Sequence, residues 1–313
     1  MRVISLIAIL VAGAVSLFAS PSSPPQDRPT FKAASELVVM HVSVRDRGGR
    51  YITGLTRDAF TVIDDGKPQS LDMFSADEVP ASVGFLIDNS NSMRPNRDGV
   101  SASSVAFAKH SHPQDEIFVL TFNETVRQAW GPRVVAEMEP AAFALAMSDA
   151  IVARGMTAIY DGIAAGLTRL ERARHTRQVL IVVSDGGDNA SKVKLDDMLK
   201  RVHESDATVY AVAMVDPLVK EGSDPGLLRR LARSTGGEFH YPRRVEDVAK
   251  AFESISKDIR NAYTIAYTPT KGGETAAQGR RRTVKVYARS QDHRVLTVRT
   301  RDGYFEKSGE DRR

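Results

Sequence analysis

Short, unbroken runs of apolar residues constrain the fold of this chain more than any other feature of its sequence. Between residues 80 and 245 these runs alternate with segments of helical character, and each run has the length of one strand. A strand that is apolar throughout is buried on both faces, which is typical of a parallel sheet covered by helices on both sides. Residues 80–245 are therefore expected to form an α/β domain with a doubly wound, mainly parallel sheet. The expected strands are 83–87, 117–122, 179–183, 209–215 and the shorter 238–240.

The first of these runs ends on a carboxylate, and two hydroxyls follow it. Asp88 comes directly after 83–87, and Ser90 and Ser92 stand at the next alternate positions. In an open α/β sheet, ligands bind at the carboxyl ends of the strands, which is where this segment would lie. One carboxylate and two hydroxyls make an all-oxygen set, and such a set suits Mg²⁺ rather than zinc or copper.

Two further oxygen ligands are expected from loops at the same edge of the sheet. Thr157 lies in a glycine-containing turn that opens a helix, and Asp185 follows the apolar run 179–183. The helix after Thr157 carries Asp161 on its first turn, where a negative charge suits the helix dipole. Asp161 is also a candidate for an outer partner of a bound metal ion.

These residues resemble the metal-ion-dependent adhesion site of the von Willebrand factor type A domain. In that family a DxSxS motif is followed by a Thr and then by an Asp on separate loops. The resemblance implies a Rossmann-like α/β fold that binds Mg²⁺, with Mn²⁺ or Ca²⁺ as the other possible ions. It assigns the metal ligands to Asp88, Ser90, Ser92, Thr157 and Asp185. The alternative is that both acids only end strands, while Ser90 and Thr157 cap helices.

Both flanks of the α/β domain have β character. In the N-terminal segment 31–79, apolar residues alternate onto one face near His41, and Asp64-Asp65-Gly66 is a hairpin signal. His41 is expected to be a packed or surface residue rather than a ligand. In the C-terminal segment 246–306, an amphipathic helix precedes further alternating runs at 262–267, 283–287 and 295–299.

The N-terminal strands are too few to bury a core alone, so the two flanks are expected to pack into one small β-sandwich. This whole arrangement resembles a bacterial subfamily of secreted proteins in which a type A domain is inserted between β segments.

The N-terminus has the pattern of a secretory signal. Residues 1–20 combine an early arginine with a short apolar stretch, and 21–30 read as a spacer rich in proline and serine. An uncleaved N-terminal anchor is the alternative. The chain has no cysteine, which excludes disulfides, thiol catalysis and cysteine–zinc sites. We therefore expect an exported protein, periplasmic or secreted, without a membrane span in the mature chain and with a short tail at 307–313.

A metal held by two carboxylates and three hydroxyls keeps a coordination position for another ligand. In the family that this site resembles, some ligands fill it with an Asp or Glu carboxylate of a protein partner. The expected function is thus metal-dependent binding of a protein partner, without catalysis. The net charge of +4 is too small and too dispersed to indicate a nucleic-acid partner, and the oligomeric state cannot be inferred.

The alternatives to partner binding are two kinds of hydrolase and an architectural module. A metal-dependent phosphohydrolase on a similar sheet would carry a second acid two residues after Asp88, but Ser90 stands there. A serine hydrolase would carry a GxSxG elbow, and neither Ser90 nor Ser92 lies in one. The third reading is architectural, with the metal stabilising the loops of a module in an envelope complex.

Overall fold

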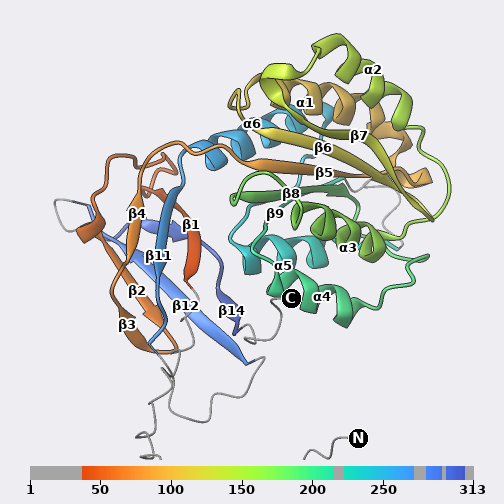
Figure 1. Cartoon of the computed structure of the whole chain (residues 1–313). Helices are drawn as coiled ribbons and strands as arrows, with labels where there is room; N and C mark the ends of the chain where they lie inside the picture. Colours follow the sequence, from red (N-terminus) through yellow and green to blue (C-terminus); the bar gives the residue numbers. More distant parts are fainter. Residues whose placement is uncertain (1–36, 215–221, 271–279, 291–293, 307–313) are drawn as a thin grey trace, which may run out of the picture. The chain divides into compact units, whose positions relative to one another are not determined.

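The computed structural model describes residues 37–214, 222–270, 280–290 and 294–306 (Figure 1). The predicted signal peptide, the spacer and the tail at 307–313 lie outside the described residues. None of the helices that are described is both long and apolar enough to cross a membrane.

A six-stranded sheet forms the centre of the α/β part, in the order β10-β9-β8-β5-β6-β7. Its first five strands in this order are parallel, and β9, β8, β5 and β6 each bury an apolar run predicted from the sequence, whereas the two-residue β10 is only partly buried. The sixth, β7, pairs antiparallel with β6 and forms one edge of the sheet. The strands are β5 (Ser82–Asp88), β6 (Glu116–Phe122), β7 (Val126–Val134), β8 (Gln178–Ser184), β9 (Thr208–Ala213) and β10 (Phe239–His240).

Helices cover both faces of this sheet, as the predicted doubly wound fold requires (Figure 1). One face packs on α1 (Arg97–Lys109), α2 (Pro140–Ala150) and α6 (Val245–Arg260). The other face packs on α3 (Ile159–Leu170), α4 (Leu195–Glu204) and α5 (Pro225–Thr235). In the part of the chain that the structure describes, segments of 3-10 helix lie at η1 (Arg57–Ala59), η2 (Asn91–Asn96) and η3 (Val135–Glu137).

The two flanks pack into a β-sandwich, as predicted. Its sheets have the orders β13-β1-β11-β4 and β14-β12-β2-β3, so each combines strands from before and after the α/β part. Side chains of both sheets share one apolar core, and its largest fully buried member is Tyr267. The strands are β1 (Val38–Arg45), β2 (Phe60–Asp64), β3 (Lys67–Gln69), β4 (Met73–Ser75), β11 (Tyr263–Tyr267), β12 (Arg281–Ala288), β13 (Thr297–Arg299) and β14 (Gly303–Phe305).

The predicted hairpin at residues 64–66 joins β2 to β3. Asp65 and Gly66 both have positive φ angles, 46° and 79°, which is the backbone of a tight two-residue hairpin turn. Glycine adopts this conformation without steric cost, and aspartate is among the few other residues that tolerate it.

Helix α6 lies between the two cores. Its apolar stripe belongs to the α/β core, where the Phe252 ring stacks on Phe85 with ring centroids 5.8 Å apart. Near its C-terminus, Asp258 is buried and accepts hydrogen bonds from Ser43 Oγ (2.5 Å) and Tyr210 Oη (2.6 Å). Arg299 of β13 forms an ion pair with the same carboxylate. The amphipathic helix that the sequence analysis grouped with the C-terminal segment therefore packs on the α/β core and also contacts the sandwich.

His41 is a packed residue of β1, in line with its predicted structural role. Its Nδ1 lies 3.2 Å from Thr264 Oγ1 on the neighbouring strand. Burial, together with the positive charges of Arg177 and Arg301, lowers the pKa of His41 to about 3.

Candidate metal-binding site

Asp88 is the last residue of β5, at the centre of the sheet. It is fully buried, and both oxygens of its carboxylate accept hydrogen bonds. Ser90 donates its backbone N–H to Oδ1 over 2.9 Å, and Ser184 donates its hydroxyl to Oδ2 over 2.6 Å. These bonds fix the carboxylate at the carboxyl edge of the parallel sheet while leaving lone pairs on both oxygens.

The surroundings of Asp88 disfavour its negative charge when no cation is present. Burial raises the pKa of Asp88 to about 6, although the hydrogen bonds from Ser184 and Ser90 act in the opposite direction. The charge of Asp185 adds to the rise, because two carboxylates on neighbouring strands repel each other. A cation placed between them would offset both effects.

The two serines of the motif lie side by side just after β5. Their Oγ atoms are 3.0 Å apart, with Ser90 buried and Ser92 exposed. The asparagine between the strand and Ser90 holds this loop in place. The Asn89 side chain donates to the Ala150 carbonyl over 3.0 Å and accepts from the Ala153 N–H over 2.5 Å. The DxSxS loop is thereby tied to the loop that leads to Thr157.

Asp185 follows β8, the strand next to β5, and is 8% exposed. Its Oδ1 accepts a hydrogen bond from the Gly187 N–H over 3.0 Å. The intervening Gly186 has a φ of +85°, and a Cβ at this position would lie 2.2 Å from the Asp224 carbonyl oxygen. Glycine is required here for both reasons, and the turn it permits lets the Gly187 N–H reach the Asp185 carboxylate.

Thr157 stands just before α3 and is tied to the loop after Asp185. Its backbone N–H donates to Asn189 Oδ1 over 2.8 Å. Its carbonyl accepts from the N–H groups of Asn189 and Ala190, over 2.9 and 3.0 Å. These three bonds hold the Thr157 loop against the loop that starts at Asp185.

Asp161, on the first turn of α3, binds the same loop further along. Its Oδ1 accepts from the backbone N–H groups of Lys192 and Val193, over 3.0 and 2.8 Å. The Asp161 carboxylate therefore positions the segment that follows Asp185. Its role as an outer partner of a metal ion remains a prediction.

The predicted residues thus lie on three adjacent loops at one edge of the sheet. Asp88, Ser90 and Ser92 form one hydrogen-bonded group, Asp185 is close enough to influence the charge of Asp88, and the Thr157 loop is bonded to both neighbouring loops. Within the described ranges, no three His, Cys, Asp or Glu side chains gather as a metal site, so a site at this edge would depend on hydroxyl ligands.

Three residues with a part in this geometry were not singled out from the sequence. They are Asn89, Ser184 and Asn189, and each forms a hydrogen bond to a side chain or backbone group of another loop or strand. Little in the sequence indicated their roles. Asn89 occupies a variable position of the DxSxS motif, and Ser184 lies between the apolar run 179–183 and Asp185.

A family model that matches the sequence identifies the family to which this chain belongs. The model of the von Willebrand factor type A domain matches residues 82–258, which is more than half of the 313-residue chain. The chain belongs to the von Willebrand factor type A family. The matched residues include β5, the three loops at the sheet edge and most of α6.

Solved structures share the fold at low sequence identity. A von Willebrand factor type A protein from Catenulispora acidiphila is 13% identical, with a TM-score of 0.51 over 88% of this chain and 74% of that chain. Proximal thread matrix protein 1 from the mussel byssus is 17% identical, with a TM-score of 0.51 over 64% of this chain and 51% of that chain. No curated protein matches this chain.

Proposed function

We propose that this type A domain binds a divalent cation and, through it, an acidic residue of a protein partner. The proposed ligands are Asp88, Ser90, Ser92, Thr157 and Asp185, and the proposed ion is Mg²⁺, because the set is all oxygen. The observation that carries the proposal is the pair of carboxylates at the ends of two neighbouring strands, where burial, and in smaller part the charge of Asp185, raises the pKa of Asp88.

The nature of the partner follows from the charge of such a site. Two carboxylates neutralise a divalent ion only when both coordinate it directly. If one acts through water, the ion keeps positive character and favours an anionic ligand at its open position. An Asp or Glu side chain of another protein supplies such an oxygen, and family members are in general interaction modules.

A catalytic role has less support. Ser90 occupies the position where a phosphohydrolase of the kind considered above would carry its second acid. We therefore propose a binding function without chemistry. Turnover of phosphate esters or carboxylic esters that disappears in Asp88→Ala would reverse this conclusion.

We also propose that the protein is exported from the cytoplasm. The apolar N-terminal stretch of residues 1–20 and the absence of cysteine suit a periplasmic or secreted protein. Detection of the full-length chain in the cytoplasmic fraction, with residues 1–20 still attached, would contradict it.

Isothermal titration calorimetry with Mg²⁺ tests the site directly. We expect the wild-type protein to bind Mg²⁺ and Asp88→Ala to lose at least about a hundredfold in affinity, because a charged ligand is removed from the centre of the site. Asp149→Ala, which removes an exposed aspartate on α2, is the matched control and should bind as the wild type does. Equal binding by Asp88→Ala and wild type would rule out the assignment.

A further inference from the structure

A groove with four arginines runs along the side of the α/β part, and the predicted metal ligands are not among the residues that line it. It is an open surface groove of about 410 Å³ between β7 and α3 that extends to α4. Arg127 comes from β7, Arg169 from α3, Arg172 from the turn after α3, and Arg201 from α4. We call this feature the arginine groove.

The arginines of the arginine groove are not paired with carboxylates of the residues that the structure describes. Across the described parts of the chain, none of its four guanidinium groups forms an ion pair, and Arg127 has only a long bond of 3.5 Å to the Thr125 hydroxyl. By contrast, Arg282 and Arg299 in the sandwich each pair with a buried carboxylate. Four like charges that line one groove repel each other, so the groove favours an anionic occupant.

The groove is also lined by apolar side chains, two of which are the small side chains of alanine. Leu120 of β6 and Val126 of β7 lie on the sheet side, and Ala164 and Ala165 lie on the helix side. The alanines leave space that larger side chains on α3 would have filled. An occupant therefore meets apolar surface at the bottom and guanidinium groups around it, which is the common make-up of a specific binding groove.

A β-bulge explains why this part of the sheet is open. Val119 pairs with Trp130 and Leu120 with Gln128, so one extra residue of β7 stands between the two pairs. The bulge changes the direction in which the side chains of β7 point. Trp130 packs on Phe143 of α2 on one face of the sheet, and Val126 packs on the core beneath α3 on the other face. The N-terminal half of β7 is thereby left as one wall of the groove.

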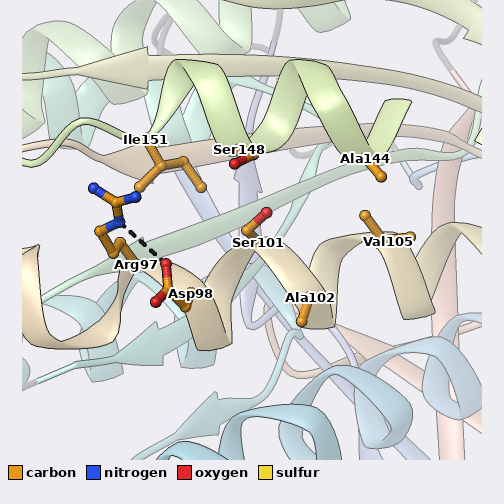
Figure 2. Close-up of a pocket in the computed structure, with 8 residues that line it drawn as sticks. All are labelled: Arg97, Asp98, Ser101, Ala102, Val105, Ala144, Ser148 and Ile151. Carbon is orange, nitrogen blue, oxygen red and sulfur yellow. Dashed lines mark hydrogen bonds and ion pairs between the residues drawn. The ribbon is translucent and has the colours of Figure 1, made fainter. Parts of the chain in front are cut away.

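A second groove of about 370 Å³, between α1 and α2, lacks this charge. Figure 2 shows its one arginine, Arg97, paired with Asp98 beside it, and the Nε–Oδ1 distance is 3.1 Å. Ser101 and Ser148 face each other across the remaining space (Figure 2). The cation of this groove is already paired within the same helix, so it does not call for an external anion.

We propose that the arginine groove binds an acidic, extended peptide segment of a protein partner. Guanidinium groups form paired hydrogen bonds with carboxylates, and four of them distributed along a groove fit several Asp or Glu side chains of one segment. The small apolar floor accommodates the intervening apolar or small side chains of that segment.

Other anionic macromolecules fit the groove less well. Single-stranded nucleic acid relies on aromatic side chains on which bases stack, and no aromatic residue lines the groove. Membrane surfaces are bound by apolar side chains that project outward, whereas Leu120 is only 7% exposed. A peptide uses both the charges and the recessed floor.

The groove begins at the edge of the sheet that carries the predicted metal ligands. Val126 pairs with Phe122, which in turn pairs with Asp88, so its upper end is two strand spacings, about 10 Å, from that ligand. Arg169 lies ten residues after Ile159 on α3, so the two residues are about 15 Å apart along the helix axis, and this distance approximates the length of the groove. About five extended residues cover such a length. The proposal requires no cation, so it stands apart from the proposed metal site.

Fluorescence anisotropy with a labelled short peptide of alternating Glu and Ala tests the inference in buffer with EDTA. We expect the wild type to bind this peptide and not its counterpart with Gln in place of Glu. The double variant Arg169→Gln/Arg172→Gln, and separately Arg127→Gln/Arg201→Gln, should each weaken binding about tenfold. Two independent pairs on different elements guard against a folding defect in either one.

The matched control removes the same charge elsewhere. Arg243→Gln/Arg289→Gln changes two exposed arginines outside the groove and should alter the affinity by less than about twofold. An equal loss in this control would mean that only the net charge matters, which overturns the proposal. Unchanged binding in both groove variants also overturns it. Binding of phosphatidylglycerol vesicles or inorganic phosphate, dependent on the groove arginines, without binding of the peptide would replace it by another class of ligand.

Discussion

His41 shows how one half-buried side chain makes the stability of the whole protein depend on pH. Its pKa is about 3 in the folded chain, and the ordinary value of 6.5 applies to the unfolded chain. The unfolded state therefore takes up a proton as the pH falls below 6.5, while the folded state does not. Stability that is present above pH 6.5 is lost as the pH falls toward 3.

We predict that this one residue accounts for about 2 kcal/mol of the stability lost between pH 7 and pH 5. Urea unfolding of wild type and His41→Gln at both values measures it. Glutamine retains a hydrogen-bonding group for Thr264 but does not titrate, so the variant should lose less stability over this interval. The prediction fails if both proteins show the same difference between the two pH values.

At the level of single residues, the position of the candidate ligands at the sheet edge could be predicted from the sequence, but the residues that hold their loops in place could not. Asp88 and Asp185 each follow an apolar strand, and a strand end in a parallel sheet has only one edge to occupy. Asn89 and Asn189 act on loops 64 and 32 residues away in the sequence. Their partners depend on how close those loops come in the folded chain, which no local pattern encodes.

Among the elements, the three loops at the sheet edge behave as one bonded unit. We predict that Asn189→Ala lowers the Mg²⁺ affinity about tenfold and the stability by about 1 kcal/mol, because the Thr157 N–H loses its acceptor. Calorimetry and urea unfolding measure the two effects. Asn189→Asp keeps an acceptor at the same place and should recover most of the stability. Full Mg²⁺ affinity in the alanine variant would show that this loop contact does not position the site.

The strands were predictable to different degrees. β5, β6, β8 and β9 are buried on both faces, so their apolar runs identify them directly. β7 was not predicted, because the bulge near Ala129 breaks the alternation and Gly131 and Pro132 interrupt the strand pattern. An edge strand with this composition can be recognised from its pairing with β6 in the structure, but not from its own sequence.

For the whole molecule, the buried Asp258 connects parts of the chain that lie far apart in sequence. Burial alone would raise the pKa of Asp258, but Arg299, the bonds from Ser43 and Tyr210, and Arg45 outweigh it and hold that pKa below its usual value. The ionised carboxylate is therefore part of the folded state, and it joins α6 to β1, β9 and β13.

We predict that Asp258→Asn lowers the free energy of unfolding by about 3 kcal/mol, because the half-buried Arg299 and Arg45 lose their buried carboxylate partner and keep only Glu238. Glu253→Gln changes an exposed acid on the same helix, paired with Lys257, and should cost less than about 1 kcal/mol. Urea unfolding followed by Trp130 fluorescence, which reports on the α/β part, and by far-ultraviolet circular dichroism measures both. A loss below about 1 kcal/mol in Asp258→Asn would contradict the prediction.

The pairing of β1 with β11 has a consequence for the time at which the chain can fold during synthesis. Val42 lies opposite Tyr263, so a ribosome must add the entire α/β part before the first strand meets its neighbour. At about 5 to 20 residues per second, this delay is roughly ten to forty seconds. Throughout that interval the apolar N-terminal strands have open hydrogen-bonding edges, which are prone to join those of other nascent chains. A chaperone that holds an extended segment is most useful to this protein until the strand that begins at Tyr263 has been made.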